Sequence, residues 1–348
     1  IPKIVLIRNQ TRMQLNQKIF GKMPDGREVF IFTFESKKSL IISIINLGGI
    51  ITSIRMPDKN GQVDEIIAGF PSLQPYLIGH PYFGAIVGRY ANRIADAGFT
   101  INGNHYKLSA NDNKNHIHGG IKGYDSQLWD PLIEINGDTA SLTLKYLSPD
   151  GEEGYPGNVE NTAVYSLDDN NHFNIRFEAH TDAPTHINLT QHTYFNLGGF
   201  KNNVSDHRLF INSNFWLETN ENHIPTGKLF SCRQTAFNFT EPNTVCFPID
   251  NCFVLSRPDA NHCPSAMLLH QSSGRSITFF LTQPGIQVYT GNFLDGSLRG
   301  HNNVVYNQYG AICLEPQHFP NSPNMPEFPS TLLMPGQLYS HQIEMHFE

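Results

Sequence analysis

Strand-forming segments recur along almost the whole of this 348-residue chain, and no segment longer than a few turns has the periodicity of a helix. The segments are short and rich in β-branched and aromatic residues, which suit a pleated, half-buried surface. They include residues 29–35, 40–56, 83–90, 141–147, 172–180, 276–282, 286–293 and 310–316. A short helix is predicted at residues 72–77. The chain must therefore build its core almost entirely from sheets.

Clusters of Gly, Asn, Asp and Ser separate neighbouring strand segments, as hairpin turns do. Four such clusters stand at residues 101–104, 135–138, 167–171 and 272–275. Regular strand–turn spacing without helical partners is typical of an antiparallel sandwich or barrel. We predict an all-β fold, a large antiparallel β-sandwich. Because no repeat, low-complexity tract or linker interrupts the chain, we predict a single domain over residues 1–348.

Composition excludes two classes of partner. The formal net charge is -7 and no Lys/Arg cluster occurs, which argues against nucleic acid binding. The longest apolar stretch, residues 40–54, is interrupted by Asn46 and two glycines and is too short to cross a bilayer, so we expect no membrane partner. We expect a cytoplasmic protein; because the chain starts at Ile1 rather than Met, a periplasmic or secreted location is the alternative. The oligomeric state is not indicated by any feature of the sequence.

The chain has five cysteines, and no pair of them has CxxC spacing. An odd number without that spacing argues against a zinc knuckle or a complete disulfide framework. We therefore expect the cysteines to be small, buried, apolar residues.

Residues 188–199, NLTQHTYFNLGG, contain one histidine and no full charge. If they form a strand, alternate side chains share a face. One face is then mostly apolar, and the other is wholly polar and carries Asn188, Thr190, His192, Tyr194 and Asn196. Amide groups donate and accept hydrogen bonds as sugar hydroxyls do, and His192 is the one group here that can move a proton near neutral pH. This face therefore suits a neutral, hydroxyl-rich ligand, or else it is a buried and satisfied polar network.

A second group of polar residues spans GRYANRI, residues 88–94, and NHIHGG, residues 115–120. Arg89 and Arg93 are four residues apart, and alternation in a strand would put His116 and His118 on one face. One interpretation is a clamp for an anion or hydroxyl with an acid/base histidine, and another is a metal-binding pair of the HxH type. The third is two polar turn residues and a surface arginine.

A third candidate is Glu315, which follows an apolar run in YGAICLEPQHFPNSPN and shares a strand face with Ala311 and Cys313. Loss of hydration raises the pKa of a carboxyl group from about 4.3 towards neutrality, where it becomes an effective base. The alternative is a strand-end glutamate in a salt bridge. We expect Pro316 to end the strand, since its missing N–H cannot join a ladder.

The strand segment before Glu315 contains QPGIQVYTGN, residues 283–292. Alternation in this strand places Gln287, Tyr289 and Gly291 on one face. This is another polar, uncharged surface with an aromatic side chain.

Six motifs, in order, resemble those of the aldose 1-epimerases, also called galactose mutarotases. The resemblance runs from about residue 20 to the end and is carried by GRYANRI, NHIHGG, NLTQHTYFNLGG, IPTG, QVYTGNFLDG and LEPQHFP. It implies a large antiparallel β-sandwich and an isomerase that interconverts the α and β anomers of free sugars such as galactose and glucose. It also implies that no cofactor and no metal is needed.

The resemblance also implies roles for single residues. Glu315 corresponds to the general base, His192 to the general acid and His118 to a second active-site histidine. The residues implied to hold sugar hydroxyls are Asn92, Arg93, Gln287 and Asp250. Asp250 lies in PIDNCF, where the family usually has Gly-Tyr-Asp-His, so its flanking residues differ. Milder departures are FNF at residues 237–239, Asn321 and Gln191. None removes a proton-transfer group, so an active enzyme is predicted.

The implied reaction moves two protons. Glu315 takes the proton of the anomeric hydroxyl O1 while His192 gives one to the ring oxygen O5, and the ring opens to an aldehyde. Rotation about C1–C2 and reclosure then give the other anomer. We expect Glu315 and His192 to face each other across a pocket wide enough for one pyranose.

Three alternatives are open at this point. A sandwich can bind sugars without catalysis, since fold does not fix function. A metal-dependent β-barrel enzyme could use His116, His118, Glu315 and His318. A mutarotase of hexose 6-phosphates needs extra Arg or Lys for the phosphate, and only Arg89 and Arg93 lie in the motifs, so we favour unphosphorylated sugars. The sequence does not rank galactose, glucose, xylose and arabinose.

Overall fold

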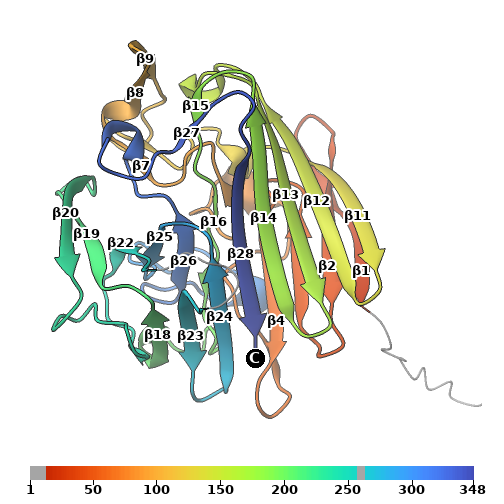
Figure 1. Ribbon diagram of the computed structural model, residues 1–348. Helices are drawn as coiled ribbons and strands as arrows, with labels where there is room; N and C mark the ends of the chain where they lie inside the picture. Colours follow the sequence, from red (N-terminus) through yellow and green to blue (C-terminus); the bar gives the residue numbers. More distant parts are fainter. Residues whose placement is uncertain (1–12, 257–262) are drawn as a thin grey trace, which may run out of the picture.

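The computed structural model describes residues 13–256 and 263–348. The described residues form many strands and little helix (Figure 1). The strands are β1 (Gln14–Lys22), β2 (Glu28–Glu35), β3 (Ile41–Ile45), β4 (Ile51–Pro57), β5 (Val63–Glu65), β6 (Ile86–Val87), β7 (Arg93–Ile94), β8 (Gly98–Ile101), β9 (Asn104–Lys107), β10 (His116–Ile117), β11 (Asp130–Asn136), β12 (Thr139–Ser148), β13 (Val159–Asp168), β14 (His172–Thr181), β15 (Thr185–His186), β16 (Thr190–Gln191), β17 (Tyr194–Phe195), β18 (His207–Ile211), β19 (Phe215–Thr219), β20 (Pro225–Ser231), β21 (Asn243–Thr244), β22 (Asp250–Val254), β23 (Ala266–His270), β24 (Arg275–Leu281), β25 (Gly285–Tyr289), β26 (Ile312–Gln317), β27 (Leu332–Leu333) and β28 (Tyr339–Phe347). The helical segments are α1 (Gln74–Ile78) and the 3-10 turns η1 (Ala95–Ala97), η2 (Tyr124–Ser126), η3 (Glu152–Gly154), η4 (Val204–Asp206), η5 (His301–Asn303) and η6 (Ser322–Asn324).

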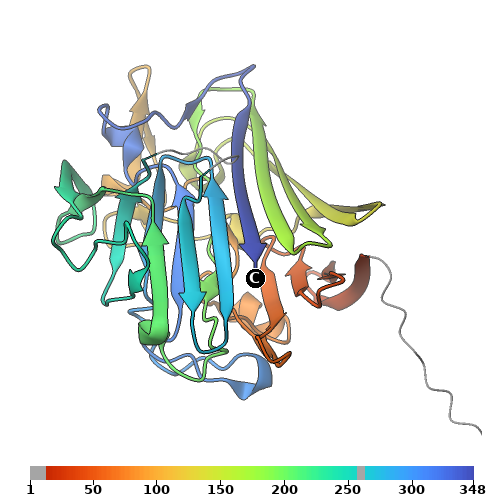
Figure 2. The same cartoon turned by 60° about the horizontal axis from the view of Figure 1, so that its bottom comes forward.

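Three sheets make up the body of the described chain. A nine-stranded sheet has the order β11-β12-β13-β14-β28-β24-β23-β18-β21, a five-stranded sheet runs from β1 to β5, and a six-stranded sheet has the order β17-β26-β25-β22-β19-β20. The last long strand, β28, lies in the middle of the nine-stranded sheet, between β14 and β24 (Figures 1 and 2). Neighbouring strands in all three sheets are antiparallel.

The core lies between the nine-stranded sheet and the other two. Alternate side chains of each strand point inward, such as Phe32 and Phe34 of β2, Ile175 of β14, and Ile312 and Leu314 of β26, and all five belong to one buried cluster. Burial of such side chains stabilises the fold by about 25 cal/mol for each Å² of apolar area that is removed from water. The predicted large antiparallel β-sandwich is confirmed.

The predicted turns and the predicted helix are also confirmed. Residues 101–104, 135–138, 167–171 and 272–275 join β8–β9, β11–β12, β13–β14 and β23–β24. In the first, Asn102 and Gly103 have φ of 51° and 81°, the left-handed pair that a two-residue hairpin turn requires. Helix α1 has five residues and begins and ends slightly later than the predicted range.

Two predicted strand segments are wrong in extent. Residues 40–56 form two strands, β3 and β4, because the chain reverses at Gly48 and Gly49, whose φ values are 61° and 53°. A side chain at Gly48 would also come within 2.1 Å of the Asp125 carbonyl oxygen. Of residues 83–90, only Ile86 and Val87 form a strand, β6.

Residues 188–199 are not one strand. They contain β16, which pairs with β6, and β17, which pairs with β26, and the chain changes partners at His192 and Thr193. Residues 188–198 are buried throughout, so no face of this stretch meets solvent. The stretch is therefore not one continuous strand, although Leu189, Phe195 and Leu197 of the predicted apolar face do join the buried core.

Pro316 does not end its strand, since β26 runs on to Gln317. On one side Pro316 lies opposite Ile286 of β25. On the other side β17 pairs with Ile312 and Cys313 only, so the ladder there has already ended and the missing N–H of Pro316 costs no bond.

The cysteines follow the prediction in part. All five are free, and Cys232, Cys252 and Cys313 are buried, whereas Cys246 is half-buried and Cys263 is exposed. Among the described residues no helix is long and apolar enough to cross a membrane.

Candidate active site

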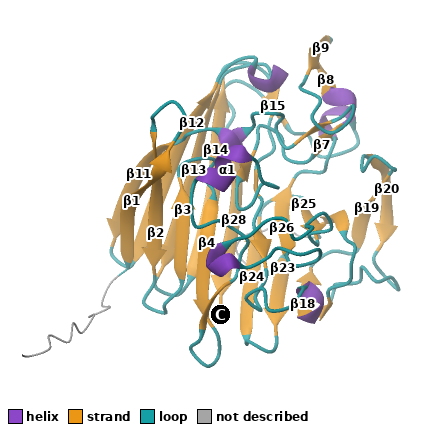
Figure 3. Ribbon diagram, turned by 180° about the vertical axis from the view of Figure 1, so that it is seen from behind, coloured by secondary structure: helices purple, strands orange, loops and turns teal. Residues whose placement is uncertain are grey.

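The outer face of the six-stranded sheet carries a polar cavity. In β26 the inward residues Ile312 and Leu314 join the core, so the period-2 alternation turns Cys313 and Glu315 outward. In β25 the same alternation turns Gln287 and Tyr289 outward, opposite Glu315 and Cys313. Figure 3 views the molecule from this side, where loops cross β25 and β26.

All seven residues implied by the family resemblance line this one cavity, whose volume is about 180 Å³. Its full lining is Pro81, Tyr82, Asn92, Arg93, Ile117, His118, His192, Tyr194, Asp250, Gln287, Tyr289, Phe293 and Glu315. The side chains come from segments more than 200 residues apart, which the sheets bring together.

Glu315 and His192 lie side by side rather than across the cavity. The Nε2 atom of His192 is 3.5 Å from the Oε2 atom of Glu315, and the two side chains are 6% and 2% exposed. No pyranose fits between groups this close, so the expected arrangement across a pocket is wrong. The two groups can instead reach two oxygens that are bonded to the same carbon atom.

Burial shifts the pKa values of this pair in opposite directions. Loss of hydration, and then the nearby charge of Asp250, raise the pKa of Glu315 well above its ordinary value. Loss of hydration lowers the pKa of His192 to about 3. Burial therefore favours the form that has the proton on Glu315 and a neutral His192.

Aromatic rings hold the imidazole of His192. The ring centroid of Tyr194 is 5.0 Å away with the planes 13° apart, and that of Tyr82 is 5.9 Å away with the planes 17° apart. The main chain fixes the residue as well, because the His192 N–H donates to Ala85 O and its carbonyl accepts from the Gly84 N–H, both at 2.9 Å.

His118 stands beside His192, with ring centroids 5.2 Å apart. Its Nδ1 accepts a hydrogen bond from the Asn92 N–H at 3.3 Å, which leaves Nε2–H as the donor of the neutral ring. Burial and the nearby His192 and Arg93 lower the pKa of His118 well below its ordinary value. His118 is therefore a neutral hydrogen-bond donor near neutral pH.

His116 does not share the position of His118. The strand β10 ends at Ile117, and His118 has φ of 53°, so the chain turns between the two histidines. The ring nitrogens of His116 are 2.7 Å from Ser109 O and 2.7 Å from the Tyr155 hydroxyl. The interpretation of His116 and His118 as a metal-binding pair of the HxH type is therefore wrong.

The two arginines have different surroundings. Arg93 donates from Nε to Asp112 Oδ2 at 2.7 Å, and its terminal nitrogens form no hydrogen bond with the described residues. Arg89 is 2% exposed and binds inside the molecule, to carbonyl oxygens of Pro156 and Gly157 at 2.8 and 3.0 Å. Arg93 is thus free to bind a ligand, whereas Arg89 is not part of a clamp.

Asp250 and Gln287 line the cavity beside Glu315, since Gln287 is its cross-strand neighbour. The amide of Gln287 donates to Asp250 Oδ1 at 2.6 Å, and the Gln287 carbonyl oxygen is buried without a partner. The structure therefore places Asp250 in the cavity although its flanking residues differ from the family pattern.

Apart from Thr190, whose buried hydroxyl has no hydrogen-bond partner, the residues of the predicted polar face divide between the two predicted interpretations. His192 and Tyr194 line the cavity. Asn188 accepts from the His318 N–H at 2.9 Å and donates to Ala91 O at 3.2 Å, and Asn196 donates to Gly310 O at 2.7 Å. The asparagines are thus a satisfied internal network, and the histidine and tyrosine face the ligand space.

Possible metal ligands among the described residues gather at one place. Ligand atoms of His192, Cys313 and Glu315 lie within 4.8 Å of one another. The set His116, His118, Glu315 and His318 does not gather, because His116 and His318 do not line this cavity. The metal-dependent alternative with those four ligands is therefore wrong.

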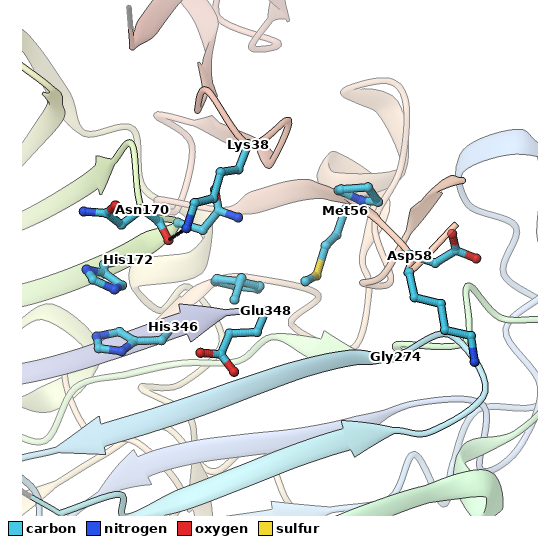
Figure 4. Close-up of a pocket in the computed structure, with 12 residues that line it drawn as sticks. Lys38, Met56, Asp58, Asn170, His172, Gly274, His346 and Glu348 are labelled. Carbon is cyan, nitrogen blue, oxygen red and sulfur yellow. Dashed lines mark hydrogen bonds between the residues drawn. The ribbon is translucent and has the colours of Figure 1, made fainter. Parts of the chain in front are cut away.

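A larger cavity, of about 620 Å³, lies where the β13–β14 and β23–β24 turns meet the end of β28 (Figure 4). Its rings of His172 and His346 stack at 3.8 Å. Each already has a carboxylate neighbour, since Asp168 lies 3.0 Å from His172 and Glu344 lies 2.6 Å from His346. None of the predicted site residues lines it.

Sequence reasoning missed Tyr82, Phe293 and Asp112. Tyr82 lies in a loop and has φ of 56°, which no local signal predicts for a tyrosine. Phe293 is 76% exposed at the cavity rim, where an exposed large aromatic residue would stand out only once the surface is known. Asp112 reaches Arg93 from a turn 19 residues away.

The fold and the site define a sandwich protein with a buried carboxyl–imidazole pair in a pocket of polar, mostly uncharged groups. The profile of the aldose 1-epimerase family matches residues 31–346. The chain is 38% identical to the galactose mutarotase of Homo sapiens over 337 residues, which cover 94% of this chain and 96% of the human protein. It is 30% identical to the aldose 1-epimerase of Escherichia coli over 338 residues, covering 93% and 96% of the two chains.

Two solved structures with related names have the same fold as this chain. The crystal structure of galactose 1-epimerase from Lactobacillus acidophilus has a TM-score of 0.83 and 25% identity, covering 97% of this chain and 99% of that one. An aldose epimerase homologue from C. elegans has a TM-score of 0.84, also at 25% identity, and covers 90% and 97%. This chain belongs to the aldose 1-epimerase family.

Proposed function

We propose that the protein is an aldose 1-epimerase, a mutarotase that interconverts the α and β anomers of free aldohexoses such as galactose and glucose. The observation that carries the proposal is the 3.5 Å contact of Glu315 with His192 in a cavity of about 180 Å³. That volume suits one sugar ring. Names of the related proteins, galactose mutarotase and aldose 1-epimerase, support the same reaction.

The pair catalyses ring opening because O1 and O5 of a hemiacetal are both bonded to C1. Glu315 removes the proton of O1 while His192 protonates O5, the C1–O5 bond breaks, and C1 becomes an aldehyde carbon. After rotation about C1–C2, O5 attacks the other face of the carbonyl group. His192 takes its proton back and Glu315 returns one to O1. Each positioned acid or base raises the reaction rate by a factor of about 10²–10⁴.

These roles require the proton of the pair to be on His192. Burial favours the form that has this proton on Glu315. Both forms contain one proton, so the net charge of the cavity is the same in the two. The sugar hydroxyls solvate the resulting carboxylate. The tyrosine rings beside His192 favour the imidazolium, since a ring face attracts a cation.

The other polar residues orient the sugar. In our proposal His118 donates from Nε2 near the ring oxygen, and Arg93 uses its terminal nitrogens for hydroxyl groups. Asn92, Gln287 and Asp250 complete the hydrogen bonds. Fixing the reacting atoms in this way lowers the entropic part of the barrier.

The alternatives fit the cavity less well. A non-catalytic sugar-binding sandwich has no use for a buried carboxyl–imidazole pair whose desolvation costs free energy. A phosphate would need further cations, and among the described residues that line the cavity Arg93 is the one Lys or Arg. We therefore favour unphosphorylated sugars. A single domain over residues 1–348 and a cytoplasmic location stay predictions.

The test is anomer exchange of freshly dissolved α-galactose and α-glucose, followed by polarimetry with and without micromolar protein. We expect the rotation to reach its final value faster in proportion to protein concentration. Heat-denatured protein is the control. An exchange rate that is the same with and without native protein would show that the protein is not a mutarotase of these sugars.

A further inference from the structure

Cys313 lies beneath the proposed acid–base pair. It precedes Glu315 by two residues in β26, on the same outward face, and lies between Tyr194 of β17 and Tyr289 of β25. Its sulfur, a ring nitrogen of His192 and a carboxylate oxygen of Glu315 are all within 4.8 Å of one another. The reaction proposed above does not use this thiol.

The three groups are buried and short of partners. Cys313 is fully buried, and no hydrogen bond of the described residues involves its thiol. The Oε2 atom of Glu315 is buried without a hydrogen-bond partner, and the Nε2 atom of His192 lies 3.5 Å from it. Buried polar atoms without partners are costly, and a ligand that bonds to them recovers this free energy.

One thiolate, one imidazole and one carboxylate are ligands for zinc and for softer divalent cations, and not for magnesium or calcium. Three protein ligands with an open fourth position are typical of zinc sites that also bind water or a substrate. The open position here would face the cavity. Bonds of about 2.0–2.3 Å place tetrahedral ligands roughly 3.3–3.7 Å apart, so small rotations of Glu315 and His192 suffice to close the set.

We propose that Cys313, His192 and Glu315 form a site for zinc or cadmium, and that the bound cation inhibits anomer exchange in competition with the sugar. The protons of the Cys313 thiol and of the Glu315 carboxyl group pass to the solvent as the metal–sulfur and metal–oxygen bonds form, because both ligands must be deprotonated. Binding of the metal is independent of the proposed function. The inhibition rests on it, because the metal engages the groups that we assign as base and acid.

Cadmium binding tests the site, since a cadmium–thiolate bond has an ultraviolet charge-transfer band. Partly exposed Cys246 and exposed Cys263 are first replaced by serine to remove other thiols. In this background we expect one Cd²⁺ per chain, with the band lost in Cys313→Ser and Cys313→Ala. Cys232→Ser, a change at another buried cysteine, should keep the band. Melting curves identify any variant that does not fold. A band of equal strength in folded Cys313 variants would overturn the proposal.

Zn²⁺ inhibition tests the consequence. We expect Zn²⁺ to raise KM for galactose at least 10-fold while kcat at saturating sugar is unchanged, and excess galactose to displace Cd²⁺. Cys313→Ala should keep its exchange activity without metal and lose the Zn²⁺ effect. Absence of a cadmium band from the background protein that retains Cys313, with normal anomer exchange, would contradict the metal site alone. A Cys313-dependent band without any inhibition would instead contradict the assigned roles of Glu315 and His192, and absent exchange in all samples would contradict the proposed function.

Discussion

At the scale of the residue, the proposed chemistry depends on two side chains whose pKa values burial shifts in opposite directions. Glu315 keeps its proton to higher pH, and His192, with a pKa of about 3, resists protonation. Their 3.5 Å contact allows one proton to pass between them. A group that favours the imidazolium therefore favours the reactive form of the pair.

Tyr82 is such a group, because its ring lies nearly parallel to His192 at 5.9 Å. A cation over an aromatic face gains about 0.5–2 kcal/mol, so we expect Tyr82→Leu to lower kcat by about 2- to 30-fold. Tyr82→Phe keeps the ring and should retain most of kcat. Polarimetric rates and melting curves of both variants check this. An equal loss in both would assign the effect to the hydroxyl group and contradict the role of the ring.

At the scale of the element, strands place Arg93, Asp250, Gln287 and Glu315, whereas His118 is placed by backbone geometry outside a regular strand. His118 follows the two-residue strand β10 and precedes Gly119, whose φ is 86°. A side chain at Gly119 would meet the Gly88 carbonyl oxygen at 1.8 Å. Close packing of the segments 88–93 and 115–120 therefore positions Asn92, Arg93 and His118 together.

Gly119→Ala tests this packing, with Gly103→Ala as a matched control. Gly103 has a similar φ, 81°, but a side chain there would meet no atom within 4 Å. We expect Gly103→Ala to cost about 1–2 kcal/mol of unfolding free energy, from the left-handed backbone alone. Gly119→Ala should cost a further 1–3 kcal/mol, approximately, from overpacking, and should lower anomer exchange at least 10-fold.

Urea unfolding and polarimetry measure both quantities. Equal stability and activity in the two variants would contradict the claim that contact with Gly88 positions His118.

Element boundaries also show what the sequence can predict. Turn chemistry at 101–104 and alternation in β14 are local, and both were predictable. The breaks in residues 188–199 and the continuation of β26 through Pro316 depend on which strand lies alongside, and that neighbour comes from a distant segment. The motifs indicated all seven site residues, but not the side-by-side contact of Glu315 and His192 or the part played by Tyr82.

At the scale of the whole molecule, the sandwich buries histidines that must remain neutral. His341 in β28, the middle strand of the nine-stranded sheet, is 1% exposed, and its Nδ1 is 3.0 Å from Leu189 O. Burial lowers its pKa to about 3. In the unfolded chain a histidine takes up a proton near pH 6.5.

The stability of the molecule should therefore depend on pH through His341. As pH falls from 6.5 towards 3, the unfolded chain binds a proton that the native protein does not, so the parent loses up to about 1.4 kcal/mol per pH unit from this residue. His341→Gln cannot titrate. We expect the unfolding free energy of the variant minus that of the parent to rise as pH falls from 6 to 4 and to be constant above pH 7.5. Urea unfolding at several pH values measures it. A difference that does not change with pH would contradict a neutral buried His341.

The central claim is that Glu315 and His192 together move the protons of one hemiacetal. Its most direct test is anomer exchange by Glu315→Gln, with galactose binding measured calorimetrically on the same sample. We predict a fall in kcat of about 10²–10⁴-fold, the share of one general base, with sugar affinity within a few-fold of the parent. Near-parental turnover in this variant, with galactose bound, would contradict the claim.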